Sequence, residues 1–137
     1  MTDTELANRF VGLWNDPDPE HRRATIRELW TEDGRQVLQP PQEMREAAAG
    51  IGFPPPRLEV RGYDEIERRV TRAYEDFVAA GGFEFRGRGN VERLDDVIKF
   101  NWEMVPAGGG DVQAVGLDVL MLDGDGRIET DYQFIEP

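Results

Sequence analysis

The sequence predicts a single α+β domain in which N-terminal helices pack on a curved, mostly antiparallel sheet. In the first half of the chain apolar residues recur at helical spacing, and from Phe83 onward they recur at every second position. Turn residues divide this second half into strands at residues 83–93, 96–106, 111–123 and 126–136. A chain of 137 residues fits one domain and is long enough to bury a core.

Two short helices are expected to open the chain. Thr2 and Glu5 have the spacing of a capping box, and Asp18 followed by Pro19 is typical of the start of a second helix. Residues 15–17 break the chain between them. The predicted buried faces carry Leu6, Phe10, Leu13 and Trp14 in the first helix and Ile26, Leu29 and Trp30 in the second.

The middle of the chain mixes short elements with one long helix. In order, the patterns predict a turn at residues 31–34, a strand at 35–39, a short helix at 42–49, a loop at 50–56 and a helix at 63–79. Pro40 ends the strand because proline cannot continue a ladder of backbone hydrogen bonds. Asp64 and Glu67 have cap spacing for the long helix, and Gly81 ends it.

Hairpin geometry assigns faces to the predicted strands. A two-residue turn at Leu94-Asp95 would place Gly87 opposite Trp102 and Gly89 opposite Phe100. The other face would be polar. The aromatic face is therefore expected to be the inner one, with Trp102 and Phe100 beside glycines that leave room above the sheet.

A symmetric turn at Gly124-Asp125 would place Asp118 directly opposite Asp131. Two carboxyl groups so close favour keeping one proton between them if they face a pocket. On the outer face they would form an ordinary solvated pair, and a bulge would separate them. Strand geometry alone leaves these alternatives open.

The net charge of −12 argues against nucleic acid or an anionic membrane surface as a partner, because both are recognised through basic patches. The chain has no cysteine, and its one histidine, His21, is expected on the helix surface. We therefore expect no metal site and no cofactor. The polar N-terminus and the lack of a long apolar run predict a cytoplasmic protein.

Two polar motifs are assigned no function. Residues 123–126 (Asp-Gly-Asp-Gly) lack the remaining ligands of a calcium loop and are predicted to form a hairpin turn. Arg22, Arg23 and Arg27 are predicted to form a solvated helix face.

The run AVGLDVLMLDGDGRI at residues 114–128, preceded by FNWEMV at 100–105, resembles the last strands of nuclear transport factor 2-like proteins of the SnoaL-like type. The opening pattern of a helix ending in Leu-Trp-Asn, an Asp-Pro break and a second helix is similar as well. The resemblance implies a cone-shaped α+β barrel around a pocket for one small apolar molecule. The same fold carries isomerases, polyketide cyclases, epoxide hydrolases and non-enzymatic domains.

Within this superfamily, Asp118 matches the inward oxyanion-binding aspartate of ketosteroid isomerases. The position of their general base holds Gln39, and that of their oxyanion tyrosine holds Phe10. Limonene epoxide hydrolases need an Arg–Asp pair on the strand that here carries Phe100 and Trp102. SnoaL-like cyclases are the nearest catalytic pattern, which implies Asp118 as the acid–base group and Asp131 as its partner.

The many aromatic residues, more than a small core can absorb, indicate a pocket. The candidate ligand-binding residues are Trp14, Trp30, Tyr63, Tyr74, Phe100, Trp102 and Gln39. Two functions remain open: an enzyme that transfers a proton through Asp118, and a non-catalytic binding or dimerisation module with the same pocket. An Asp118 already bonded to Tyr or Gln would favour the second.

Apolar residues also occupy the strand face opposite Asp118. Val115, Leu117, Val119 and Met121 take the alternate positions of the strand at residues 111–123. Four consecutive outward apolar residues are unusual for a solvated face. They predict a homodimer through the outer face of the sheet.

Overall fold

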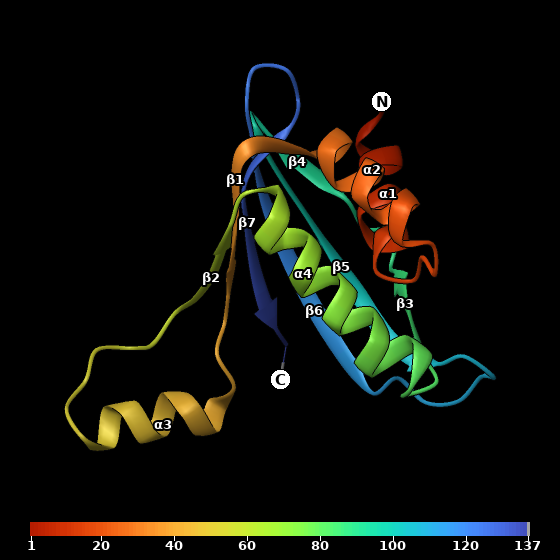
Figure 1. Cartoon of the computed structure of the whole chain (residues 1–137). Helices are drawn as coiled ribbons and strands as arrows, with labels where there is room; N and C mark the ends of the chain where they lie inside the picture. The colour runs from red at the N-terminus through yellow and green to blue at the C-terminus, as the bar shows by residue number, and fades with distance from the viewer. Residues whose placement is uncertain (137) are drawn as a thin grey trace.

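The computed structural model describes residues 1–136, which form an α+β fold with a mostly antiparallel sheet. The sheet order is β2-β1-β7-β6-β5-β3, with the short β4 paired to β5, and β1 runs parallel to β7. Figure 1 shows α1, α2 and α4 on one side of this sheet and α3 standing apart from it. The elements are α1 (Asp3–Leu13), α2 (Pro19–Leu29), β1 (Trp30–Leu38), α3 (Gln42–Gly50), β2 (Leu58–Arg61), α4 (Tyr63–Ala73), the π-helix η1 (Tyr74–Ala79), β3 (Phe83–Gly87), β4 (Glu92–Leu94), β5 (Val97–Pro106), β6 (Ala114–Leu122) and β7 (Ile128–Ile135).

The first two helices begin where the sequence predicts. Thr2 and Glu5 form the complete capping box of α1, and the Asp18 side chain accepts hydrogen bonds from the first backbone N–H groups of α2. Each cap satisfies backbone donors that have no partner within the helix.

The helices and the inner face of the sheet enclose an aromatic core. The ring centroid of Phe10 on α1 lies 5.5 Å from that of Trp30 and 5.4 Å from that of Phe100 on β5, and all three side chains are buried. The assignment of the aromatic face of β5 to the inside is confirmed.

The edge of the sheet differs from the prediction. Residues 31–34 belong to β1, whose pairing with β7 is interrupted by a bulge between Trp30 and Arg35. The sequence pattern did not predict β2, which pairs with β1 from Arg35 opposite Arg61 to Leu38 opposite Leu58. These two strands reach beyond the core and carry α3 between their ends (Figure 1).

The predicted helix at residues 63–79 is present in two parts, with α4 continuing into η1. Asp64 is not the N-cap residue of α4. Gly62, with a φ of 84°, occupies the N-cap position, and α4 begins at Tyr63. A π-helical turn holds one more residue than an α-helical turn and is often found at functional sites.

The hairpin register around β5 is confirmed at one end and wrong at the other. Gly87 lies opposite Trp102 as predicted, but Phe100 does not pair with Gly89. Gly89, with a φ of 71°, belongs to a bulge, in which the Asn101 carbonyl accepts from the Arg88 N–H while the Asn101 N–H donates to the Asn90 side chain. The turn residues are consequently 95 and 96, because Leu94 pairs with Val97.

The predicted register of the last hairpin is also wrong, by two residues. Asp118 lies opposite Gln133, and Asp131 lies opposite Leu120. The loop is longer than two residues: the Asp123 N–H donates to the Arg127 carbonyl, and Asp123 Oδ1 accepts from the backbone N–H groups of Asp125 and Arg127. A shift of two keeps every side chain on its face, so both aspartates remain on the inner side.

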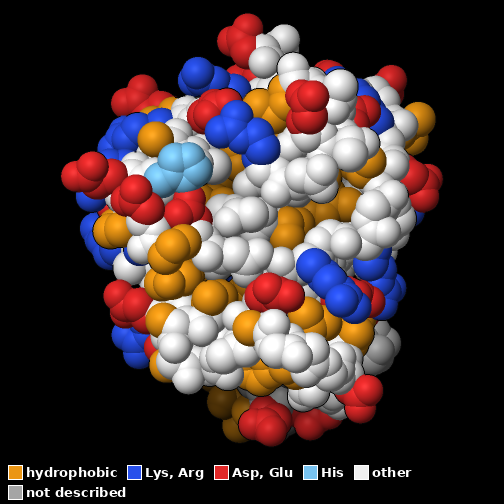
Figure 2. All heavy atoms as spheres, turned by 90° about the vertical axis from the view of Figure 1, so that its right-hand side faces the viewer, with side chains coloured by type: hydrophobic (Ala, Val, Ile, Leu, Met, Phe, Trp, Pro, Cys, Tyr) orange, Lys and Arg blue, Asp and Glu red, His pale blue; other side chains and the backbone are white. Residues whose placement is uncertain are grey.

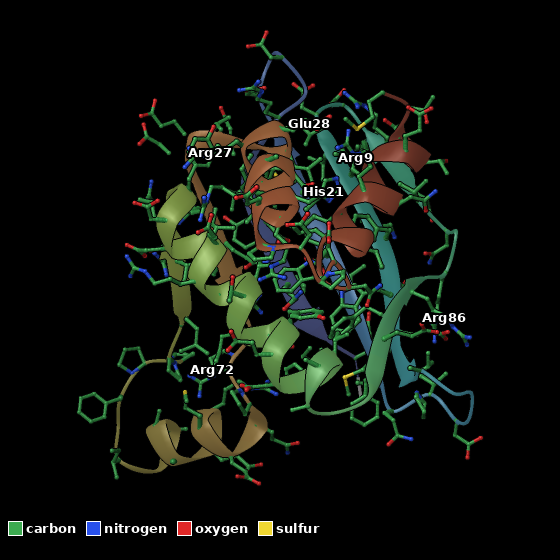
Figure 3. All side chains as sticks on the ribbon, turned by 45° about the vertical axis from the view of Figure 1, so that its right-hand side comes forward. Arg9, His21, Arg27, Glu28, Arg72 and Arg86 are labelled. Carbon is green, nitrogen blue, oxygen red and sulfur yellow. The ribbon has the colours of Figure 1, made fainter. Side chains whose placement is uncertain are left out.

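Most charged side chains lie on the periphery. Figure 3 shows Arg9 and Glu28, which form an ion pair between α1 and α2, and Arg86 on the outer side of β3. The single histidine, His21, lies on the surface among charged groups, as predicted (Figure 2). Arg22 contradicts the prediction of a solvated face: it is buried, with its guanidinium 4.9 Å from the centre of the Tyr74 ring.

No helix among residues 1–136 is long and apolar enough to cross a membrane.

Candidate functional site

A cavity of about 460 Å³ lies between the helices and the inner face of the sheet. Its walls are mainly apolar, and its polar lining residues are Gln39, Arg69 and Gln133. The apolar wall includes Phe10, Val11, Trp14, Phe77, Phe85 and Met104. This is the size and character of a pocket for a small organic molecule.

Three aromatic rings form one continuous side of the cavity. The centroid of Phe85 on β3 lies 6.3 Å from that of Phe77 in the π-helix and 5.5 Å from that of Trp102 on β5. Both pairs are edge-to-face, the arrangement that aromatic quadrupoles favour. This wall therefore holds its shape through ring contacts.

The position of Trp102 depends on a glycine in the neighbouring strand. Gly116 lies opposite Trp102, and a Cβ atom at Gly116 would stand 2.0 Å from the indole ring. Because Gly116 has no side chain, the ring can lie over the strand. There its Nε1–H donates to Asp118 Oδ1 at 2.5 Å.

Asp118 and Asp131 are fully buried and contact each other. Asp118 Oδ1 also accepts from Gln133 Nε2 at 3.2 Å, and Asp131 Oδ2 accepts from Gln36 Nε2 at 2.6 Å. Trp102 and Gln133 line the cavity whereas the two aspartates do not, so the carboxyl pair lies behind its wall.

The surroundings of the pair favour one shared proton. Burial raises the pKa of Asp118, while its hydrogen bonds with Asp131, Trp102 and Gln133 lower it. Burial, together with the negative charge of Asp118, raises the pKa of Asp131 well above its usual range. The two carboxyl groups therefore titrate as one coupled pair, which retains a single proton more readily than two free aspartates do.

The positive charge of Arg69 on α4 acts on both carboxyl groups. Its Nη2 donates to Gln133 Oε1 at 3.0 Å, and its guanidinium lies 4.7 Å from the centre of the Trp14 ring. Burial lowers the pKa of Arg69 to about 10, although the charges of Asp131 and Asp118 oppose the change. The guanidinium therefore remains positively charged at neutral pH.

Of the predicted ligand-binding residues, Trp14, Gln39 and Trp102 line the cavity. Trp30 and Phe100 do not, because both pack against Phe10 in the core. Tyr63 and Tyr74 also lie outside the lining. The Tyr63 hydroxyl donates to the Trp30 carbonyl, and the Tyr74 ring packs on Arg22.

Three polar residues of the site were missed by the sequence analysis. The sequence holds a signal for two of them. Arg69 falls between Ile66 and Val70 on the predicted apolar side of its helix, and Gln133 lies two residues after Asp131, on the same strand face. Gln36 is a polar residue in a short predicted strand, but its inward direction follows from the pairing of β1 with β7.

The residues described give no indication of a metal centre. Among residues 1–136, no group of three or more His, Cys, Asp or Glu side chains is placed to hold a metal ion.

The chain is similar to known proteins in its three-dimensional structure. No family model matches the sequence, and no curated protein matches it. A solved structure of a proposed isomerase of the SnoaL-like family from Agrobacterium tumefaciens matches with a TM-score of 0.77 and 25% identity, over 100% of both chains.

Two further structures have the same fold at lower identity. An NTF2-like protein of unknown function from Mesorhizobium loti has a TM-score of 0.64 and 16% identity, over 98% of this chain and 91% of the other. A proposed polyketide cyclase from Bacillus cereus has a TM-score of 0.62 and 14% identity, over 98% and 75%. The chain has the nuclear transport factor 2-like fold, and the structures that it resembles include SnoaL-like proteins.

Proposed function

We propose that this protein binds one small, largely apolar molecule in the cavity between α1, α4 and the sheet. The observation that carries the proposal is the cavity itself, which has about 460 Å³ of space inside aromatic walls. Its few polar lining groups would orient a ligand, as is usual in small-molecule sites.

The hydrogen bonds of Asp118 support binding over direct proton transfer. Trp102 and Gln133 both donate to Asp118 Oδ1, and these two residues stand between the carboxyl group and the cavity. A general acid or base must come within hydrogen-bond reach of its substrate. A ligand in the cavity would meet Gln133 and Trp102 instead.

The neutral dye N-phenyl-1-naphthylamine, whose fluorescence rises in apolar surroundings, tests the proposal. We expect saturable binding to the wild type. Ala73→Phe should weaken it at least about tenfold, because Ala73 lines the cavity and the added ring would occupy it. Ala47→Phe, on the exposed α3 helix, is the matched control and should bind normally. A dye that does not bind, or that binds equally to both variants, would contradict the proposal.

Proton transfer through the carboxyl pair is the second candidate. Gln133 favours it, because this side chain lines the cavity and covers Asp118, so its rotation would bring the carboxyl group within reach of a ligand. Two solved structures of the same fold are a proposed isomerase and a proposed polyketide cyclase.

Exchange of the methyl protons of 2-acetylnaphthalene in D₂O measures such transfer directly. If this candidate holds, the wild type accelerates the exchange, Asp118→Asn does not, and the exposed control Asp125→Asn keeps wild-type activity. Exchange no faster than in buffer, at saturating ketone, would leave binding as the function.

A further inference from the structure

The side chain of Arg69 lines an apolar cavity with most of its hydrogen-bonding capacity unused. A guanidinium carries five N–H donors. Among residues 1–136, one acceptor is bonded to it, Gln133 Oε1, and Nη1 is buried with no partner at all. A buried donor without an acceptor costs free energy, so an acceptor brought by a ligand would be stabilised here.

Gln39, another polar residue of the cavity lining, offers a second donor. Its side-chain oxygen accepts from the Ile135 N–H at 2.9 Å, and within residues 1–136 its amide N–H₂ group has no hydrogen-bond partner. The backbone N–H of Gln39 donates to the backbone carbonyl of Gln133 at 2.9 Å, and the side chain of Gln133 accepts from Arg69. Gln133 therefore contacts both residues, the Gln39 backbone through its carbonyl and the Arg69 guanidinium through its side chain.

Charge balance decides which acceptor fits. The guanidinium is positive, and the carboxyl pair behind it carries about one negative charge when it shares a proton. The two together are close to neutral. A carboxylate on the ligand would bring an unbalanced negative charge into an apolar cavity, in a protein whose net charge is −12. A neutral oxygen acceptor brings none.

From this arrangement we infer that the ligand is a neutral molecule with a carbonyl oxygen, which accepts hydrogen bonds from Arg69 and Gln39. The remainder of the ligand is apolar and contacts the wall of Phe77, Phe85 and Trp102. The inference rests on the proposed binding function and adds the chemical class of the ligand. Arg69 is then the residue that determines specificity.

Three naphthalenes of similar size test the inference. 2-Ethylnaphthalene has no acceptor, 2-acetylnaphthalene has a neutral carbonyl, and 2-naphthoate has a carboxylate. Their affinities follow from displacement of N-phenyl-1-naphthylamine. We expect the wild type to bind the ketone at least about tenfold more tightly than 2-ethylnaphthalene, a difference of about 1.4 kcal/mol, and more tightly than the carboxylate.

Arg69→Met removes the guanidinium but keeps an unbranched side chain. In this variant the preference for the ketone should fall to within about twofold, while the affinity for 2-ethylnaphthalene is kept. Arg68→Met, its exposed neighbour on α4, is the matched control and should retain the full preference. A preference for the ketone that persists in Arg69→Met would overturn the inference.

Two further outcomes decide the class of ligand. Equal wild-type affinities for the ketone and 2-ethylnaphthalene would overturn the inference and leave the binding function intact. If 2-naphthoate binds most tightly, the ligand is an anion, and the inference of a neutral carbonyl is overturned. Displacement of the dye by none of the three would instead contradict the proposed function itself.

An infrared measurement on the wild type covers the case in which Arg69→Met does not fold. The carbonyl stretch of bound, ¹³C-labelled 2-acetylnaphthalene should lie at lower wavenumber than in hexane, because hydrogen bonds weaken the C=O bond. Gln39→Met should reduce this shift. An unshifted band in the wild type would overturn the inference.

Discussion

At the scale of single residues, the carboxyl pair has the largest consequences for stability. Asp118 and Asp131 lose all contact with water, and burial disfavours their charged forms. Hydrogen bonds from Trp102, Gln133 and Gln36 compensate in part. Because the folded protein binds the shared proton more tightly than the unfolded chain does, the pair makes stability depend on pH.

The sign of this dependence follows from the raised pKa of Asp131. The contribution of such a group is complete below its unfolded pKa and is lost as pH rises through its folded pKa. Asp131→Asn cannot ionise, and its amide can still donate to Asp118 and accept from Gln36. As pH rises from 4 to 8, the free energy of unfolding of Asp131→Asn should therefore increase relative to that of the wild type. The increase should be about 1.4 kcal/mol for each unit by which the pKa of Asp131 is raised.

Urea unfolding at a series of pH values measures this difference. Asp125→Asn, in the exposed turn, is the control for loss of one acidic residue and should follow the wild-type profile. A difference between Asp131→Asn and the wild type that is constant with pH would show that Asp131 is ionised throughout this range.

Gly116 leads to a second prediction at this scale. In Gly116→Ala the new methyl group would overlap the Trp102 ring, which must move and release its hydrogen bond to Asp118. We expect a loss of at least about 2 kcal/mol in the free energy of unfolding. Gly124→Ala, where a Cβ atom meets nothing within 4 Å, should change it by less than about 0.5 kcal/mol. Equal stability of the two variants would show that the strands separate to admit the methyl group.

At the scale of elements, α3 and the core helices differ in what holds them. None of the α3 side chains is buried, and Met44, Ile51 and Phe53 in and after this helix are exposed. Figure 1 shows α3 at the end of its two strands, away from the other helices. Tertiary packing supplies most of the stability of ordinary protein helices, and α3 has little of it.

Replacing residues 42–55 with a Gly-Ser linker of about four residues should therefore change the free energy of unfolding by less than about 1 kcal/mol. This replacement retains the pairing of Leu38 with Leu58, the last pair between β1 and β2 before α3. Chemical denaturation provides the measurement, and binding of N-phenyl-1-naphthylamine should persist. A fall of more than about 2 kcal/mol in the free energy of unfolding would mean that α3 packs on the rest of the protein in solution.

At the scale of the whole molecule, the outer face of the sheet has apolar character. Val115, Leu117 and Val119 are half-buried, Met121 is 37% exposed, and Phe134 on the neighbouring strand, opposite Leu117, is 44% exposed. Exposed apolar patches of this kind often mark interfaces between proteins. We propose that two copies of the chain pair through this face.

Sedimentation equilibrium at micromolar concentration tests the pairing. The wild type should be a dimer, and Leu117→Glu a monomer, because a charge at the centre of an apolar interface would be buried without a partner. Leu94→Glu, at an exposed hairpin end, should remain a dimer. A monomeric wild type would contradict the proposal.

The sequence predicts the local elements well because their signals are local. Caps at Thr2 and Asp18 depend on side chains within three residues, and the inward direction of Phe100 and Trp102 depends on strand alternation. Exact pairing is less local. The bulge at Gly89 and the long loop at residues 123–127 each moved a register by two residues.

By itself, then, the sequence determined the α+β class, the resemblance to the SnoaL-like fold, and the placement of Asp118 and Asp131 on one face. That placement survived a wrong register because a shift of two preserves the face of every residue. The tertiary structure decided what surrounds the pair. Gln36 reaches Asp131 because β1 runs parallel to β7, and Arg69 reaches Gln133 because α4 packs over the sheet. These partners lie 95 and 64 residues apart in the chain, and no local pattern encodes contacts over such distances.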